Sequence, residues 1–145
     1  MFGFIGKLNT NTKNELFSAS VLVIEDNATD RIFFERILTK RGFRVFTAQN
    51  SEEGMALAAL ENVDVILLDY VLPDRSGLEV CRILKEDKRT RMIPIIFLTV
   101  VAEGYAMMEC FEAGAAAFLT KPISAKELVR EVELTLREAR EDDNA

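Results

Sequence analysis

Four consecutive apolar residues, Val65 to Leu68, run directly into the carboxylate of Asp69. The run is too short for a buried helix and rich in branched side chains, so it predicts a strand that is covered on both faces. Pro73 and Gly77 indicate that a loop follows the strand. Strands of this kind belong to open α/β sheets, which bind ligands at the carboxyl ends of their strands. The stretch therefore predicts an acid at the functional edge of a parallel sheet.

Apolar strands and helical patterns alternate along the chain from residue 20. Asn27 and the capping boxes that begin at Ser76 and Ser124 indicate where helices start. Five strand–helix units within about 120 residues have connections that permit parallel pairing, with helices on both faces. We therefore predict a doubly wound, five-stranded parallel α/β sheet with five helices. Order 2-1-3-4-5 is favoured, because strands 1 and 3 then flank the switch point where a crevice opens. The predicted strands cover residues 20–24, 43–47, 65–68, 94–98 and 115–119.

The 145 residues suffice for one domain, which we place at residues 20–137. Residues 1–19 combine a short apolar start with a polar tract and are interpreted as a flexible N-terminal extension. A docking segment is the alternative, because several apolar side chains fit one face of a short helix. These side chains are Phe2, Phe4, Ile5 and Leu8. Residues 138–145 are predicted to form an acidic C-terminal tail, too short for an output domain.

The chain contains no histidine and carries a net charge of −6 at pH 7. Without histidine, histidine-based triads, histidine zinc sites and phosphohistidine are excluded. The negative charge argues against a nucleic-acid surface, whose affinity rests on clustered cations. No apolar run approaches the roughly 20 residues of a membrane span. Cys81 and Cys110 have neither zinc-ligand spacing nor the pattern of a disulfide framework, so we expect a reducing, cytoplasmic location.

Chemically informative residues follow four of the predicted strands. Glu25 and Asp26 follow the first strand, Asp69 the third, Thr99 ends the fourth and Lys121 follows the fifth. In a parallel sheet all of them project from one edge, and acids that lie close together raise a pKa or require a cation. Mg²⁺ is the cation that suits carboxylates together with phosphate oxygens. A lysine and a hydroxyl beside it would bind a phosphoryl group, and Asp69 is placed to be the nucleophile. The pattern predicts Mg²⁺-assisted phosphoryl transfer onto a carboxylate.

The same residues resemble the receiver domain of two-component response regulators, the CheY-like family. The motifs are E-D-N at Glu25 to Asn27, D-Y-V-L-P-D-R-S-G at Asp69 to Gly77, Thr99, and K-P at Lys121-Pro122. The likeness covers about residues 20–137. Each motif is weak alone, whereas four in this order at four strand ends are specific. The resemblance implies that Asp69 is the phosphoacceptor.

By position, the resemblance also assigns the neighbours of the phosphoacceptor. It implies that Asp26 and Asp69 bind Mg²⁺ directly, together with the backbone carbonyl of Val71. Glu25 would act through a water molecule. Lys121 would contact the phosphoryl oxygens and pair with Asp69 before phosphorylation.

A phosphorylation-driven switch is implied for Thr99 and Phe118. Thr99 would move inward to hydrogen-bond the phosphoryl group, and Phe118 would follow from an exposed to a buried position. A plain strand-end hydroxyl and a core aromatic are the alternatives for these two residues, and a helix cap is the alternative for Asp26. The Lys121-Pro122 peptide bond, at Pro122, is expected to be cis as in the family.

Three branched apolar residues depart from the family pattern at the mouth of the site. These residues are Val71, Val100 and Val101. In the family, polar side chains at the mouth help to position the attacking water. An apolar gate of three valines should exclude that water. We therefore predict slow loss of the phosphoryl group and poor phosphorylation by small donors.

The resemblance implies a stand-alone phosphoacceptor signalling domain that is not an enzyme, although it assists its own phosphorylation and dephosphorylation. Its donor would be a histidine kinase or a phosphotransfer protein, and its output an unknown downstream protein; a homodimer stays open. The alternative is a pseudo-receiver that acts as a constitutive protein–protein interaction module. An aspartyl phosphatase is disfavoured, because that class has a second acid where this chain has Val71. A flavin-binding domain is disfavoured by the lack of a phosphate-binding loop after the first strand.

Overall fold

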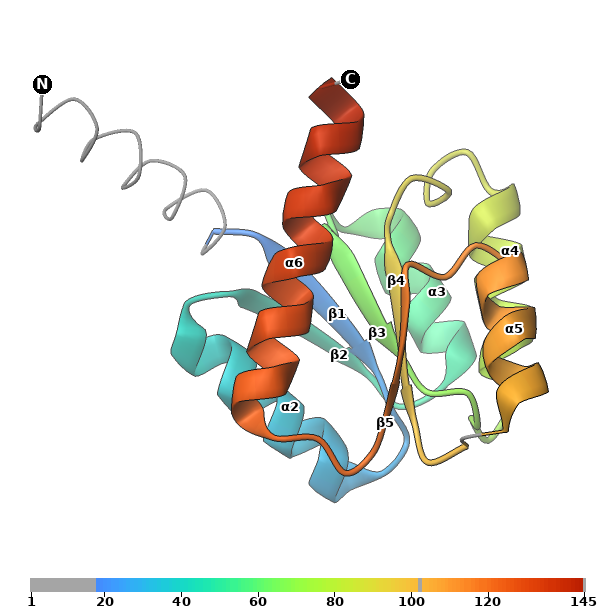
Figure 1. Ribbon diagram of the computed structural model, residues 1–145, viewed down its shortest axis with the longest axis horizontal. Coiled ribbons are helices and arrows are strands. Elements are labelled where there is room, and N and C mark those ends of the chain that lie inside the picture. Colours follow the sequence, from blue (N-terminus) through green and yellow to red (C-terminus); the bar gives the residue numbers. More distant parts are fainter. Residues whose placement is uncertain (1–17, 102, 145) are drawn as a thin grey trace, which may run out of the picture.

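A computed structural model describes residues 18–101 and 103–144. Its strands form a parallel sheet in the order β2-β1-β3-β4-β5 (Figure 1). The predicted fold class and strand order are therefore confirmed. The strands are Ser20–Ile24 (β1), Arg44–Ala48 (β2), Val65–Leu68 (β3), Ile95–Thr99 (β4) and Ala117–Thr120 (β5).

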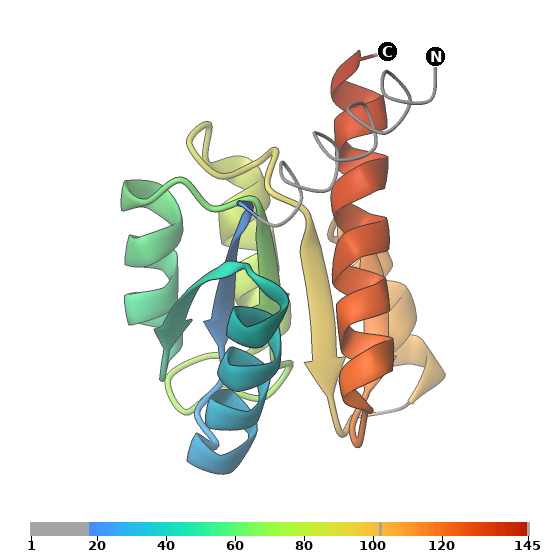
Figure 2. The same ribbon diagram turned by 90° about the vertical axis from the view of Figure 1, so that its left-hand side faces the viewer.

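Helices cover both faces of the sheet, as Figures 1 and 2 show. The helices are Ala28–Arg41 (α2), Ser51–Leu60 (α3), Gly77–Glu86 (α4), Gly104–Glu112 (α5) and Ala125–Asn144 (α6). Buried side chains of α2 and α6 pack in one core cluster, and those of α3, α4 and α5 pack in a second. Among the residues described, no helix is long and apolar enough to cross a membrane.

The uninterrupted apolar runs are explained by these two layers of helices. Successive strand residues point to opposite faces, so Val21 and Val23 of β1 belong to one core cluster and Leu22 and Ile24 to the other. Every residue of β1, β3 and β4 is buried. A polar residue within these strands would be buried in either layer, which confines the chemistry to the strand ends.

Capping side chains fix where the helices around the site begin. Asn27 accepts a hydrogen bond from the Asp30 N–H at 2.9 Å, and Ser76 accepts one from the Glu79 N–H at 3.2 Å. Each such cap contributes about 1 kcal/mol. Asn27 starts α2 directly after Asp26, and Ser76 starts α4 at the end of the loop that begins at Asp69, so each acid lies between a strand end and a capped helix.

Two predictions concern the ends of the chain. The last helix continues beyond residue 137 to Asn144, so residues 138–144 of the predicted acidic tail extend α6. The interpretations of the N-terminal extension, including docking through Phe2, Phe4, Ile5 and Leu8, fall on residues 1–17, outside the part of the chain that the structure describes.

Candidate functional site

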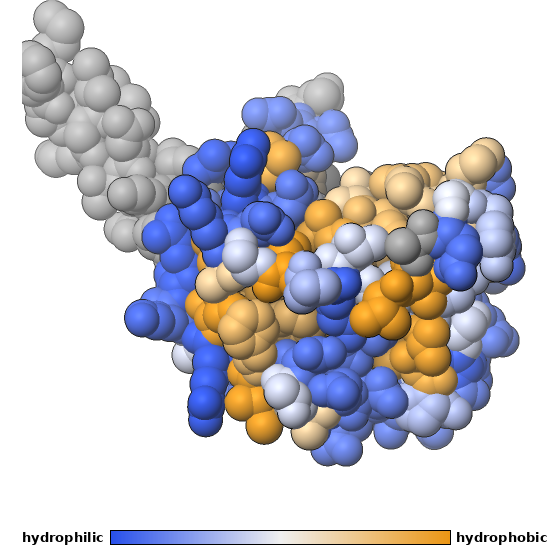
Figure 3. All heavy atoms as spheres, turned by 60° about the horizontal axis from the view of Figure 1, so that its bottom comes forward, coloured by the Kyte–Doolittle hydropathy of each residue, from blue (hydrophilic) through white to orange (hydrophobic). Residues whose placement is uncertain are grey.

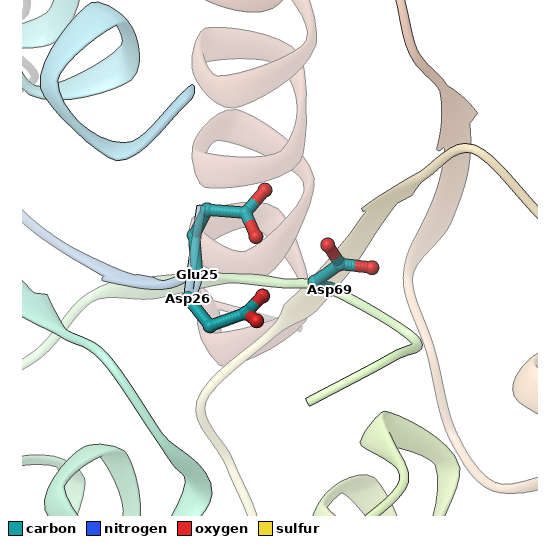
Figure 4. Close-up of side chains that lie close together, drawn as sticks. All are labelled: Glu25, Asp26 and Asp69. Carbon is teal, nitrogen blue, oxygen red and sulfur yellow. The ribbon is translucent and has the colours of Figure 1, made fainter. Parts of the chain in front are cut away.

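Three carboxylates meet where β1 and β3 end side by side. Ile24 of β1 pairs with Leu68 of β3, so the residues that follow them are brought together. The Asp69 N–H donates to the Ile24 carbonyl at 3.2 Å, which continues the pairing by one residue. Glu25, Asp26 and Asp69 each offer an oxygen, and these oxygens lie within 4.8 Å of one another (Figure 4). The predicted switch point therefore carries an acidic cluster.

The donor set of this cluster suits a hard divalent cation. Oxygens bound to one Mg²⁺ lie about 2.1 Å from the ion, hence no more than about 4.2 Å from each other. The three carboxylates offer oxygens within 4.8 Å of one another, which is close enough for a single ion to gather them directly or through a water molecule. Glu25 and Asp69 are buried whereas Asp26 is exposed, so the cluster is open to solvent on one side. The residues present therefore fit the ion that the receiver resemblance implies.

Lys121 lies among the acids and reaches them from the loop after β5. Its ammonium donates to Glu25 Oε1, to Asp30 Oδ2 at 2.9 Å and to Asp69 Oδ2 at 3.1 Å. The Lys121 side chain is 9% exposed. Because an ammonium has three N–H donors, these contacts occupy all of them.

Asp30 is a site residue that the sequence interpretation missed. An acid in the first turn of α2 ordinarily complements the helix dipole, whereas here the carboxylate of Asp30 forms an ion pair with Lys121. A signal was available, because an acid in the first turn of a helix that begins beside a strand end can face that strand end. Its partner in the loop after β5, however, lies 91 residues away in the sequence.

Burial and hydrogen bonds shift the pKa values of Glu25 and Asp69 in opposite directions. Burial raises the pKa of Glu25 to about 7, and the hydrogen bond from Lys121 offsets only part of this effect. Burial also acts to raise the pKa of Asp69, but hydrogen bonds from Glu25, the Val71 N–H and Thr99 hold it below its ordinary value. For Lys121, the acidic partners outweigh the effect of burial and raise its pKa. Asp69 is therefore kept ionised while its neighbour Glu25 retains a proton readily.

The residues of the implied switch lie on β4 and β5. Thr99 is fully buried, and its hydroxyl accepts a hydrogen bond from the Val101 N–H at 3.3 Å. Phe118 is half-buried, and its ring stacks on Phe97 with centroids 6.1 Å apart. The Lys121-Pro122 peptide bond is cis. Movement of Thr99 and Phe118 on phosphorylation stays a prediction.

The loop between β3 and α4 is tied to the strand end at several points. The Val71 N–H donates to Asp69 Oδ1 at 3.1 Å, and the Gly77 N–H donates to the Tyr70 carbonyl at 2.6 Å. A Cβ on Gly77 would collide with the backbone of Asp69, so close approach requires glycine there. The loop therefore fixes both the main chain and the carboxylate of Asp69.

Asp74, in the same loop, has a structural role. Although Asp74 is exposed, its carboxylate caps the start of α3. It accepts hydrogen bonds from the Ser51 N–H at 3.0 Å, the Ser51 hydroxyl at 2.6 Å and the Glu52 N–H at 3.1 Å. These bonds lower the pKa of Asp74 to about 2.

The three valines of the predicted gate lie around this edge of the sheet. Val71 is 56% exposed and Val100 is 71% exposed, while Val101 is half-buried. Figure 3 views the molecule from this side and shows hydrophobic surface next to hydrophilic surface. Exclusion of water by the valines stays a prediction.

Comparison with known proteins identifies a family that the chain matches. Residues 21–133 match the family described as response regulator receiver domain. The transcriptional regulatory protein ResD of Bacillus subtilis is 37% identical over 119 residues, which cover 82% of this chain and 48% of that protein. The phosphate regulon transcriptional regulatory protein PhoB of Pseudomonas aeruginosa is 36% identical over 118 residues, which cover 81% of this chain and 52% of that protein. The chain thus spans about half the length of these curated relatives.

Solved structures agree with the sequence relatives. A CheY-like response regulator receiver domain protein from Methanospirillum hungatei has a TM-score of 0.82 at 24% identity, covering 86% of this chain and 98% of that chain. At this low identity, the similarity to the Methanospirillum protein shows a shared fold alone. The receiver domain of Francisella response regulator 1452 has a TM-score of 0.77 at 26% identity, covering 83% of this chain and 98% of that chain.

Proposed function

This chain belongs to the response regulator receiver domain family, and we propose that it accepts a phosphoryl group on Asp69 in a Mg²⁺-dependent reaction. The observation that carries the proposal is the environment of the Asp69 carboxylate. One oxygen accepts from Lys121 at 3.1 Å and the other accepts from the Val71 N–H at 3.1 Å. Such contacts keep the carboxylate ionised and fix its orientation, as a nucleophile requires.

The neighbouring residues fit the remaining roles. Asp26 and Asp69, with the Val71 carbonyl, would hold Mg²⁺ directly, and Glu25 would hold it through water. When bound, the ion supplies positive charge to the phosphoryl oxygens. Lys121 neutralises part of the charge on Asp69 in the resting state and would donate to the transferred group.

The donor must come from another protein or from a small phosphorylated compound, since this chain has no histidine of its own. We propose a histidine kinase or a phosphotransfer protein, in the cytoplasm. The phosphorylated domain would then signal to a downstream protein through a changed surface, and self-catalysed loss of the phosphoryl group would end the signal. The stand-alone arrangement and the homodimer stay predictions.

Labelling with a radioactive phosphodonor, with and without Mg²⁺, tests the proposal. Wild type is expected to incorporate label only with Mg²⁺, and Asp69→Asn to incorporate none. Asp87→Asn is a matched control, because Asp87 follows α4 and its carboxylate pairs with Arg89, away from the acidic cluster. It is expected to label like wild type.

Two outcomes would contradict the proposal. Label that persists in Asp69→Asn would place the phosphoacceptor elsewhere. A wild type that no kinase, phosphotransfer protein or acetyl phosphate labels would favour the pseudo-receiver, a constitutive protein–protein interaction module.

A further inference from the structure

The ion pair between Lys121 and Asp30 adds a fourth carboxylate to the environment of the proposed phosphoacceptor. We propose that Asp30 is a positioning residue that holds Lys121 toward α2 and so weakens the binding of a phosphoryl group at Asp69. The inference rests on the proposed function, since it concerns the lysine that would contact that group.

The backbone of Asp30 is fixed independently of the ion pair. Its N–H donates to the capping side chain of Asn27 at 2.9 Å, in the first turn of α2. The carboxylate projects from this fixed point to Lys121, 2.9 Å away. Asp30 therefore meets Lys121 at a defined place, and the contact depends on the negative charge of the acid.

The three acidic partners of Lys121 differ in how readily they can be released. The Glu25 side chain is 3% exposed and that of Asp69 is 10% exposed, whereas that of Asp30 is 36% exposed. A carboxylate that loses its partner is compensated by water only where it is accessible. Asp30 is thus the partner that Lys121 can leave at least cost.

Phosphoryl binding requires such a release. All three N–H groups of Lys121 are occupied, so a donor to new phosphoryl oxygens becomes available only when one contact breaks. The carboxylate of Asp30 competes with the phosphoryl oxygens for that donor. Arg31, the next residue, directs its guanidinium to the backbone carbonyls of Glu25 and Asp26, at 2.9 and 3.2 Å. Because these hydrogen bonds direct Arg31 to backbone carbonyls, the cation that pairs with the Asp30 carboxylate is Lys121.

Titration with beryllofluoride at saturating Mg²⁺ tests the inference, because this anion mimics a phosphoryl group on a carboxylate. Asp30→Asn is expected to bind it about threefold more tightly than wild type, within the range that partly exposed ion pairs give. Asp30→Glu keeps the charge and the reach to Lys121, so wild-type affinity is expected. In a Lys121→Gln background, Asp30→Asn should give no gain, because the residue acts through the lysine.

The outcomes separate this inference from the proposed function. Wild type that binds no beryllofluoride would contradict the proposed function, and the inference with it. Binding by wild type with no gain in Asp30→Asn, or with the same gain in the Lys121→Gln background, would overturn the role of Asp30 alone. If Lys121→Gln does not bind beryllofluoride, the comparison of Asp30→Glu with Asp30→Asn replaces this test. Equal affinities of these two variants would then overturn the role of Asp30.

Discussion

Replacing Gly77 by alanine tests how the loop after β3 positions Asp69. A Cβ at Gly77 would lie 2.9 Å from the Tyr70 Cα and far closer to the Asp69 carbonyl oxygen than real Cβ atoms approach. Both neighbours are backbone atoms, so no side-chain rotation relieves the contact. Gly104 provides a matched control, because it also begins a helix and a Cβ there meets nothing within 4 Å.

The size of the effect follows from these contacts. Relief of the collision needs a backbone shift of about 1 Å, since atoms of this kind approach no closer than van der Waals contact. Overpacking of this severity costs about 3 kcal/mol of unfolding free energy. Gly104→Ala is expected to stabilise the fold by about 0.5 kcal/mol, because alanine restricts the unfolded chain more than glycine does. A displacement of about 1 Å at Asp69 would also slow phosphorylation roughly 100-fold.

Urea unfolding followed by circular dichroism measures the free energy of unfolding. The chain has no tryptophan, which makes this signal preferable to fluorescence. The rate of labelling by acetyl phosphate measures the effect on phosphorylation. Equal stabilities and equal labelling rates for the two glycine variants would refute the reasoning. A stable Gly77→Ala that labels slowly would show that the loop yields and carries Asp69 with it.

Three further predictions concern other parts of the fold. The depressed pKa of Asp74, about 2 against an ordinary 3.8, stabilises the fold above pH 4. This stabilisation should be lost as the pH falls towards 2, and urea unfolding across this range should show a smaller loss in Asp74→Asn. Burial raises the pKa of the Cys110 thiol to about 11, so iodoacetamide at pH 8 should modify it in urea but not in the native protein, as mass spectrometry would show. Making Val71 and Val101 both polar should shorten the lifetime of the phosphorylated form; an unchanged lifetime would contradict the apolar gate.

Local patterns determined most of the fold in advance. Continuous apolar runs identify strands buried on both faces, and Asn27 and Ser76 cap helices as their sequence context predicts. The apolar run predicts that β5 begins at residue 115, two residues before its start at Ala117. The Ala115 N–H donates to the Cys110 carbonyl, which completes the end of α5 before pairing with β4 begins. Apolar character alone does not show whether a backbone N–H completes a helix end or pairs with a neighbouring strand.

Contacts that side chains make across loops are not predicted from the sequence. The predicted site residues that follow β1 and β3 meet because the pattern of elements implies the strand order. Asp30 and Asp74 were missed because their partners depend on how far a side chain reaches across a loop. Asp74 contacts Ser51, which lies 23 residues earlier in the sequence. Local propensity determines neither the direction of the β3–α4 loop nor the distance from Asp74 to the start of α3.

The roles within the acidic cluster follow from environment more than from residue type. Glu25 and Asp69 are both buried carboxylates in contact with Lys121. Asp69 also accepts hydrogen bonds from the Val71 N–H and Thr99, and its pKa falls, whereas burial dominates at Glu25 and its pKa rises. Neighbouring acids whose pKa values are pushed apart take different chemical roles, and the one that stays ionised is suited to attack. In the proposed function, the β3–α4 loop, through Gly77 and the Val71 N–H, would thus favour Asp69 as the nucleophile and Glu25 as a ligand.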